Sequence, residues 1–488
     1  MQTETRSHSN KEKLLHNIIE MGKLTGPSGV PVLGNLLQLN TEKLHRIIES
    51  WSDQYGSIFK IKLGSIPVVV ITASETIQYV LKNRPEKFKR LGRMDDVIRE
   101  MGIFGVFNAE GDDWKRQRKL VSQALNINHI KSFFPALDKI TEKLLDRWNR
   151  LALENSSIEI KGELMRYTVD ITSKLAFGYD MNTIEKNNDI IQDHLEVIFP
   201  AIFKRINFPI PYWRFLKLPA DKKLDRSLKA ISKTMKNIID ETRKQLVQNK
   251  TLLDHPANFL QALLAASTLD NPISNEVIAG NVLTMLLAGE DTTAHTMAWI
   301  LYFMHLNPGV QIKMQQEVDR VLANENTLKN YERAADLHYI EAVALEAMRL
   351  KPVAPVLYHE TLEDVVLEGV RVPKNTAIFA QTHYAAINET HFSNAGNFIP
   401  ERWMEGGCPA HKAHDDKALV PFGAGPRFCP GYNLALLEIK AVLSMLCKNF
   451  LITMETNPES VNEKLAFTMM PSDFFVRLVK RNNIQQAD

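Results

Sequence analysis

The 488-residue sequence predicts a mainly α-helical protein with a smaller β region. Helical patterns cover most of residues 130–270, and a long apolar helix is predicted from about Asn275 to Leu306. Alternating apolar patterns, which are typical of strands, are confined to short segments. At 1.5 Å per residue the long helix would span roughly 48 Å, which is enough to cross a whole domain.

Length alone would suggest about three domains of ~150 residues each. The chain nevertheless has no repeat, low-complexity tract or Ser/Gly linker that would mark a boundary, and its 44% hydrophobic residues can fill one large core. We therefore expect one catalytic domain over residues 22–488, an N-terminal segment over residues 1–21, and a monomer.

Charge and cysteine content restrict the class of protein. A net charge of +2 gives no electrostatic footprint for nucleic acid. Three cysteines are too few for a disulfide framework, which favours a reducing compartment, the cytoplasm. The polar start, Met1–Asn10, has no signal-peptide core, and no segment reaches the ~20 continuous apolar residues of a membrane span. We expect no transmembrane anchor.

The first regular elements in chain order form a predicted β-hairpin. Its strands are Ser57–Leu63 and Val68–Thr72, joined through Gly64 and Ser65. Near the other end of the chain, Phe474–Lys480 alternates and predicts a closing strand.

Trp114 and Arg118 lie four residues apart on a predicted helix, so both are on one face. Spacing alone does not distinguish a ligand-binding pair from a helix with one buried Trp and one solvated Arg. The helical region that follows is interrupted at Phe208–Trp213. A basic run comes next, and a charged face is most often simply solvated. Its members are Lys217, Lys222, Lys223, Arg226, Lys229, Lys233 and Lys236.

The middle of the long helix contains a polar cluster, Ala288–Thr293. A glycine such as Gly289 costs about 1 kcal/mol relative to Ala in a helix, and ionised groups cost more when they are buried. The cluster is therefore a candidate site. A hydroxyl beside a carboxylate, as in Thr292 and Asp291, can relay protons from water. The alternative is a Thr292 hydroxyl that bonds back to a helix carbonyl.

Glu346 and Arg349 are three residues apart and neighbours on one predicted helix face. A surface ion pair is the ordinary explanation of such spacing. The apolar residues around them, Leu345, Met348 and Leu350, favour a less exposed position.

The densest Gly/Pro cluster, Pro421–Gly431, contains Cys429 and precedes an apolar helical pattern. Such segments form tight turns and let the backbone approach a ligand closely. A helix start behind the cysteine offers free N–H groups and a positive dipole end, which lower the pKa of a thiol and prepare it to ligate a metal. For a lone cysteine, a buried structural role is the more common explanation.

The spacing Phe-Gly-x-Gly-x-Arg-x-Cys-x-Gly from Phe422 to Gly431 resembles the haem loop of the cytochrome P-450 family at every fixed position. Three further family motifs agree in order and spacing, at Trp114, Ala288 and Glu346. The resemblance covers nearly the whole chain. It implies the cytochrome P-450 fold, a triangular haem-thiolate domain, of the soluble kind found in bacteria.

The resemblance implies roles around a b-type haem. Cys429 would be the axial ligand of the iron, and Trp114, Arg118 and Arg427 would bind the propionates, which suit the planar fork of Arg. His359 stands where many relatives have Arg for the second propionate, and its contact would be pH-sensitive. A solvent-facing loop His is the alternative. The other expected haem contacts are Phe422, Gly423 and Ala288.

Further roles follow from the same resemblance. Asp291 and Thr292 would form the acid–alcohol pair that guides protons, with Glu290 turned to solvent or to another helix. Arg402 would join Glu346 and Arg349 in a buried charge network. In its segment Trp403 replaces the usual Phe. The family uses the region around Phe208–Trp213 as a mobile lid, which makes Trp213 and Phe215 candidates for contact with lipid or substrate.

The implied activity is that of a monooxygenase that inserts one oxygen atom of O₂ into a C–H bond of a hydrophobic substrate, such as a fatty acid, terpenoid or steroid-like compound. Electrons would come from a ferredoxin or flavodoxin with its reductase, docked near Lys115, Arg116, Lys119 and Lys440. The expected pocket walls are apolar or small: Leu286, Leu287, Ala288, Val353, Ala354, Val356, Leu357, Phe467 and Met469.

Two other functions are weighed against this one. The first is a haem-thiolate isomerase or peroxygenase that does not activate O₂, and the second is a non-catalytic haem-binding sensor. The intact pair of Asp291 and Thr292 argues against both, because neither needs a proton relay.

Overall fold

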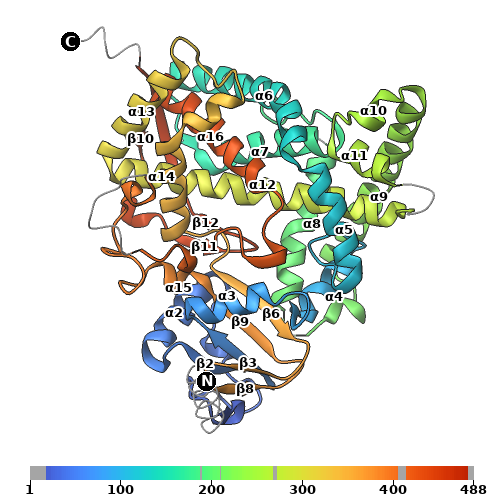
Figure 1. Cartoon of the computed structure of the whole chain (residues 1–488), viewed down its shortest axis with the longest axis vertical. Coiled ribbons are helices and arrows are strands. Elements are labelled where there is room, and N and C mark those ends of the chain that lie inside the picture. Colours follow the sequence, from blue (N-terminus) through green and yellow to red (C-terminus); the bar gives the residue numbers. More distant parts are fainter. Residues whose placement is uncertain (1–17, 187–189, 209, 268–271, 405–413, 482–488) are drawn as a thin grey trace, which may run out of the picture. The chain divides into compact units, whose positions relative to one another are not determined.

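The computed structural model describes residues 18–186, 190–208, 210–267, 272–404 and 414–481 (Figure 1). Contacts divide the chain into two compact units, and each unit is assembled from three separate stretches of sequence. The first unit comprises Met1–Asp95, Ala354–Ala395 and Asp415–Phe428. The second comprises Asp96–Val353, Gly396–His414 and Cys429–Asp488. One helix, α4 (Gly92–Glu100), runs across the boundary.

The first unit contains most of the β structure. Its larger sheet has the strand order β2-β3-β9-β6-β4, and a smaller sheet has the order β1-β8-β7. The strands are β1 (Ile19–Glu20), β2 (Ile58–Leu63), β3 (Ile66–Ile71), β4 (Phe88–Arg90), β6 (Val356–Thr361), β7 (Val365–Leu367), β8 (Val370–Val372) and β9 (Ala377–Gln381). The helices are α2 (Leu44–Tyr55), α3 (Ser74–Lys82) and α15 (Thr382–Ala386).

The predicted hairpin is confirmed as the antiparallel pair β2 and β3, in which Leu63 lies opposite Ile66. Gly64 has a φ of +64°, a left-handed conformation that glycine adopts without strain. Alternate side chains of β3, including Val69 and Ile71, enter the core of this unit, where they pack with residues of α3, β7, β8 and β9. Val68 and Val70 on the other face of β3 are fully buried as well, so the strand is covered on both faces.

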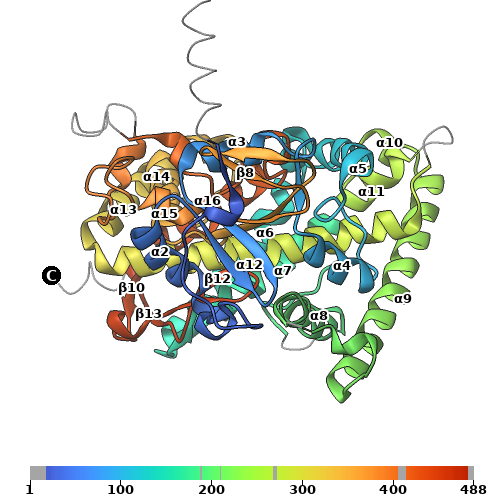
Figure 2. The same ribbon diagram turned by 90° about the horizontal axis from the view of Figure 1, so that it is seen from below.

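The second unit is built around α12 (Asn275–Leu306), whose bounds agree with the sequence prediction. Figures 1 and 2 show this helix running through the helical unit, with α7 alongside it. The Ser274 side chain caps its start by accepting from the Val277 N–H. A Cβ at Gly289 would lie 2.3 Å from Cγ2 of Thr172 in α7, so glycine allows these two helices to pack closely.

Six helices confirm the helical prediction for the described part of residues 130–270: α6 (Ile127–Leu153), α7 (Ile160–Phe177), α8 (Ile190–Asn207), α9 (Pro219–Gln248), α10 (Thr251–Asp254) and α11 (Phe259–Ala266). A 3₁₀ turn, η4 (Tyr212–Arg214), lies at the predicted interruption. The unit also contains α5 (Gly111–Ala124), α13 (Pro308–Leu322), α14 (His338–Leu350) and α16 (Tyr432–Asn449).

Small antiparallel sheets complete the second unit. The predicted closing strand is confirmed as β13 (Phe475–Lys480), which lies between β10 (Phe450–Met454) and β5 (Ile158–Glu159). A two-stranded pair consists of β11 (Glu463–Leu465) and β12 (Met469–Pro471). Among the helices of the described residues, none combines the length and the apolar character of a membrane span.

Candidate active site

Cys429 lies directly before α16, where the N–H groups of Gly431 and Tyr432 donate to its thiol. These hydrogen bonds and the charge of Arg118 favour the thiolate, as the sequence predicts. Burial of the sulfur nevertheless outweighs them and raises the pKa of the Cys429 thiol. The prediction of a lowered pKa is therefore wrong for the thiol by itself, and it is coordination to a metal that would remove its proton.

The loop that leads to Cys429 belongs to the first unit as far as Phe428. Gly423 and Gly425 have φ values of +73° and +68°, so two of its glycines occupy left-handed conformations. A Cβ at Gly425 would lie 2.7 Å from Cα of Lys82 at the end of α3. The rings of Phe422 and Phe428 are 6.4 Å apart. Glycine therefore lets this loop pack tightly on α3.

Trp114 and Arg118 both lie on α5, as predicted, with the indole buried and the guanidinium half-buried. The charge of the Cys429 thiolate acts on Arg118, although burial of the guanidinium lowers the pKa of Arg118 overall. Gln117 accepts a 2.9 Å hydrogen bond from Asn281 of α12, which ties α5 to the central helix. The second unit thus brings Arg118 near the cysteine.

In the centre of α12, the side chain of Ala288 is exposed and those of Asp291 and Thr292 are half-buried. Most residues of this helix from Thr293 onward are buried. Thr292 Oγ1 donates to the Ala288 carbonyl at 2.6 Å. The alternative from the sequence analysis, a Thr292 hydroxyl that donates to a carbonyl of its own helix, is therefore present. The Thr292 hydroxyl oxygen can still accept a hydrogen bond. Glu290 is buried rather than turned to solvent, and Thr168 of α7 donates to its backbone carbonyl.

Asp291 is adjacent to Thr292 and is partly buried. Burial raises the pKa of its carboxyl to about 6, against the opposing charge of Lys161. A carboxyl with a pKa in this range can both release and recover a proton near neutral pH.

His295 is a residue of this region that the sequence analysis missed. Its Nδ1 lies 2.8 Å from Oγ1 of Thr468, in the connection between β11 and β12. Burial and the charge of Lys161 lower the pKa of His295 to about 3, so the ring is neutral. The neighbouring Phe467 ring lies 6.1 Å from the ring of Phe107. The spacing of four residues from Asp291 was the signal in the sequence that could have identified it.

His359 lies on β6 of the first unit and is 2% exposed, so the alternative of a solvent-facing loop is wrong. A hydrogen bond to the Lys89 backbone acts on the ring and opposes the effect of burial. Burial and the guanidinium charges of Arg84, Arg90 and Arg427 lower the pKa of His359 well below its ordinary value. The ring is therefore neutral at ordinary pH, which does not support the pH-sensitive contact expected from the sequence.

Three guanidinium groups whose charges act on the buried His359 ring form a place for an anion. In the second unit, the Cys429 sulfur receives N–H groups and lies near a further arginine. A thiolate donor together with carboxylate-binding cations is the donor set that a haem with two propionates requires. The residues present fit this cofactor.

The buried charge network predicted around Glu346 is confirmed. Arg349 donates to both carboxylate oxygens of Glu346, at 2.9 and 2.8 Å, and Arg402 donates at 3.0 Å. All three side chains are fully buried. The indole N–H of Trp403 also donates to Glu346, at 2.9 Å. The Trp that replaces the usual Phe therefore adds a hydrogen bond that its size alone did not predict.

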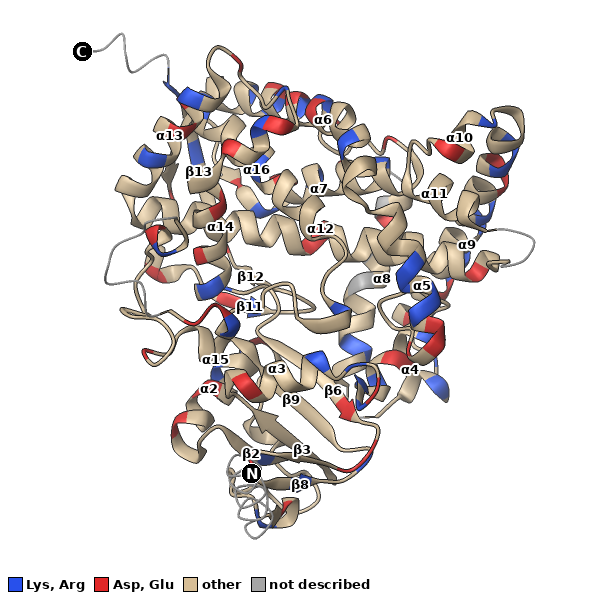
Figure 3. Cartoon of the chain, viewed as in Figure 1, with Lys and Arg blue, Asp and Glu red and all other residues tan. Residues whose placement is uncertain are grey.

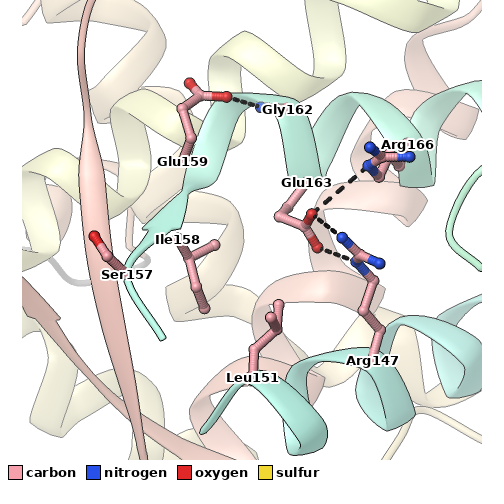
Figure 4. Close-up of a pocket in the computed structure, with 8 residues that line it drawn as sticks. All are labelled: Arg147, Leu151, Ser157, Ile158, Glu159, Gly162, Glu163 and Arg166. Carbon is pink, nitrogen blue, oxygen red and sulfur yellow. Dashed lines mark hydrogen bonds and ion pairs between the residues drawn. The ribbon is translucent and has the colours of Figure 1, made fainter. Parts of the chain in front are cut away.

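A separate pocket of about 280 Å³ lies between the end of α6 and the start of α7 (Figure 4). Its main charges satisfy one another, because Glu163 accepts from Arg147 at 2.5 and 2.7 Å and lies 3.6 Å from Arg166. Both arginines also donate to backbone carbonyls of residues 183–186. These hydrogen bonds stabilise the segment of residues 183–186. The pocket is therefore not a candidate catalytic site.

The family model named Cytochrome P450 matches residues 24–478, and the chain belongs to this family. Its members are haem-thiolate monooxygenases that bind haem b through a cysteine thiolate and receive electrons from redox partners.

Curated relatives from plants and mammals agree with this assignment. The chain is 26% identical to Protein LUTEIN DEFICIENT 5, chloroplastic, of Arabidopsis thaliana, over 81% of the chain and 67% of the relative. It is 24% identical to Cytochrome P450 97B2, chloroplastic, of Glycine max, over 98% and 89%. It is 25% identical to Cytochrome P450 3A31 of Mesocricetus auratus, over 89% and 86%.

Proposed function

We propose that Cys429 is the thiolate ligand of haem b in a monooxygenase that hydroxylates a hydrophobic substrate. The observation that carries this proposal is the thiol of Cys429 directly before α16, with two N–H donors and the charge of Arg118 acting on it. A thiolate-bound haem supplies the activation of O₂ and the oxidation of the C–H bond. The protein sets the ligand, the access of protons and the shape of the pocket.

The family to which the chain belongs supports the haem contacts that its motifs imply. In the second unit, Trp114 and Arg118 would bind one propionate. In the first, Arg427 would bind a propionate, and His359 would donate to the other from a neutral ring. The Arg427 guanidinium and a neutral imidazole N–H of His359 can each donate a hydrogen bond to a propionate carboxylate. Phe422, Gly423 and Ala288 would contact the macrocycle.

Asp291 and Thr292 would deliver protons to the reacting centre. The Thr292 hydroxyl is oriented by its bond to the Ala288 carbonyl, so its oxygen can accept a hydrogen bond from a water. The partly buried Asp291 carboxyl, with a pKa of about 6, can replace the proton that is consumed. An isomerase or a sensor has no use for such a pair, so the monooxygenase is favoured.

The substrate would be a hydrophobic molecule such as a fatty acid, a terpenoid or a steroid-like compound. The apolar character of Leu286, Leu287, Phe467 and Met469 supports this class. Four members of the predicted wall are buried: Leu286, Leu287, Val356 and Met469. Its more accessible members are Ala288, Val353, Ala354, Leu357 and Phe467.

A ferredoxin or flavodoxin with its reductase would supply the electrons. Lys115, Arg116 and Lys119 are exposed on α5, close in sequence to Arg118, and the blue residues on this helix are visible in Figure 3. An acidic partner would be attracted by such a surface. Lys440 does not belong to it, because its ammonium is buried in an ion pair with Glu341, 2.6 Å away, and donates to the Ala334 carbonyl.

We also propose that residues 22–488 act as one catalytic domain, preceded by an N-terminal segment over residues 1–21, and that the enzyme is a cytoplasmic monomer. The interleaving of the two compact units supports a single domain, because neither unit is a continuous stretch of chain. The described cysteines are free thiols, which supports a reducing compartment.

The test of the proposed ligand compares Cys429→Ser with Cys447→Ser. Both residues are free cysteines, and Cys447 lies fully buried in α16. We expect the reduced, carbon monoxide-bound Soret band typical of a thiolate ligand to disappear in Cys429→Ser and to persist in Cys447→Ser. A thiolate spectrum that survives in Cys429→Ser would refute the assignment. Product formation that requires both O₂ and NAD(P)H would separate a monooxygenase from an isomerase or peroxygenase.

A further inference from the structure

The residues proposed to deliver protons lie on one face of α12, and α7 packs on the opposite face. Successive residues of a helix are turned by about 100°, so Ala288, Asp291 and Thr292 share one face, and Glu290 and Thr293 lie on the other. Burial agrees with this division, because Glu290 and Thr293 are buried and the other three residues are not. The position of the proton-delivering face therefore depends on what holds α12 from behind.

A hydrogen bond from α7 reaches the backbone of α12 directly before Asp291. The hydroxyl of Thr168, which is fully buried, donates to the Glu290 carbonyl at 2.8 Å. This carbonyl belongs to the peptide unit that joins Glu290 to Asp291, and a peptide unit is planar. The bond from Thr168 therefore fixes the backbone plane next to the Cα of Asp291.

The Thr168 hydroxyl has a choice of acceptors. Two carbonyls of its own helix also lie within reach, those of Leu164 at 3.2 Å and Met165 at 3.1 Å. A hydroxyl has one proton to donate, and the Glu290 carbonyl is the closest of the three acceptors. Threonines in helices often bond back to their own helix. Thr168 differs because its closest acceptor lies on a neighbouring helix.

A second contact between the two helices lies one turn further along α7. The Thr172 hydroxyl donates to the Thr168 carbonyl at 2.7 Å, and its methyl carbon Cγ2 lies against Gly289. A Cβ at Gly289 would come within 2.3 Å of this methyl carbon. The helix α7 therefore contacts α12 at Gly289 and Glu290, the two residues directly before Asp291.

We propose that Thr168 is a positioning residue for proton delivery, which holds the segment of α12 that carries Asp291 and Thr292. This inference rests on the proposed roles of those two residues. The bond of the Thr292 hydroxyl to the Ala288 carbonyl orients it only within α12, so its place in the enzyme depends on the neighbours of that helix. Proton transfer needs donor and acceptor within hydrogen-bond reach, and a misplacement of about 1 Å can cost on the order of 100-fold in rate.

The experiment compares variants of the full-length, haem-loaded protein. Thr168→Val removes the hydroxyl at nearly constant volume, and Thr168→Ser returns it without the methyl group. The matched control is Thr242→Val, because Thr242 is also buried and its hydroxyl donates to the Ile238 carbonyl of its own helix, α9, at 2.8 Å. Asp291→Asn is measured alongside. The haem spectrum is recorded for each variant, and Thr168→Ala takes the place of Thr168→Val if the latter does not fold.

Two quantities are measured. The first is hydrogen exchange of the backbone amides of α7 and of residues 288–296, followed by mass spectrometry. The second is the pH dependence of NADPH oxidation driven by a plant ferredoxin and its reductase. The exchange experiment reports how firmly the helix is held and does not depend on turnover.

We expect the amides of residues 288–296 to exchange about fivefold faster in Thr168→Val, as the loss of one buried hydrogen bond implies. NADPH oxidation should slow in this variant. The kinetic pKa that we assign to Asp291, about 6, should fall, because a carboxyl with more water around it ionises more easily. Thr168→Ser should restore the exchange rates, the rate of oxidation and the kinetic pKa. Thr242→Val should match the parent protein in all three.

Two results would overturn the inference. The first is faster exchange in Thr168→Val that is confined to α7, which would show that the hydroxyl serves only its own helix. The second is faster exchange in residues 288–296 with the pH profile of the parent protein, while Asp291→Asn changes that profile. Thr168 would then support the fold without positioning the carboxyl. A parent-like profile in Asp291→Asn itself would instead refute the proton delivery on which the inference rests.

Discussion

Arg402 Nε donates to Glu346 Oε1 at 3.0 Å, although 56 residues separate the two in the sequence. Both side chains are fully buried. The carboxylate of Glu346 accepts hydrogen bonds from the guanidinium groups of Arg349 and Arg402 and from the Trp403 indole N–H. Removing one member of a buried ionic set leaves the others charged and unpaired, which costs about 3–5 kcal/mol.

The first prediction follows from this network. Glu346→Ala should lower the free energy of unfolding by about 3–5 kcal/mol and should yield little haem-loaded protein. Denaturant unfolding and the ratio of Soret to protein absorbance measure both effects. Glu241→Ala serves as control, because Glu241 forms only an exposed pair with Lys244. Normal haem content in the Glu346 variant would contradict the prediction.

The second prediction concerns the Asp291 carboxyl. Because its pKa rises from 3.8 to about 6, the fold disfavours the ionised form, and stability is lost as pH rises through this range. Asp291→Asn, which cannot ionise, should therefore stabilise the protein by at most about 3 kcal/mol at pH 7, and hardly at all near pH 4. The same variant should slow turnover and should remove a kinetic pKa of about 6 from the pH–rate profile.

The Asn variant is compared with Asp240→Asn, which changes an exposed residue of α9. Unchanged turnover in Asp291→Asn would exclude the proposed proton delivery, even if its gain in stability were observed.

A third prediction tests the contact of His295 with Thr468. Loss of a hydrogen bond of about 1 kcal/mol should loosen the β11–β12 connection on α12 and alter the ratio of oxidation products, with haem content retained. We expect His295→Leu and Thr468→Val to change the product ratio in the same way, and the double variant to add little. His295→Asn should restore the parent ratio. His305→Leu, near the C-terminal end of the same helix, is the control.

The fourth prediction concerns His359. Replacing it with Leu removes a neutral donor from a site with three guanidinium charges nearby, and the haem affinity should fall roughly tenfold or more, as expected for a hydrogen bond to a charged group. His359→Arg should retain haem. Transfer of haem to an excess of apomyoglobin gives the dissociation rates, with His391→Leu as control. Equal rates for His359→Leu and the parent protein would disprove a propionate contact.

A fifth prediction concerns the electron donor. Lys115→Glu with Arg116→Glu should slow reduction by an acidic ferredoxin at low salt, and the difference should shrink as ionic strength rises. The effect should be moderate, because both cations already lie within ion-pair distance of Asp112 and Asp113. Stopped-flow absorbance measures the rate, and Lys139→Glu on α6 is the control. Reduction that is independent of these charges would place the partner elsewhere.

Local patterns in the sequence determined the elements and the haem motif. The apolar spacing from Asn275 to Leu306 specified α12, because helix periodicity and the capping residues at the helix ends are properties of residues close together in the sequence. Pro421–Gly431 specified the cysteine loop for the same reason, since tight turns are encoded by the glycines that occupy them.

The tertiary structure decided what depends on distant residues. It buried His359 near arginines from other elements, placed Thr468 on His295 and made the Trp403 indole a donor to Glu346. It also reversed the expected shift in the pKa of Cys429, because burial of a thiol depends on packing from the whole unit. Only the tertiary structure decided that Trp213 is buried, with its indole N–H donating to Glu100 at 2.9 Å, whereas Phe215 is exposed.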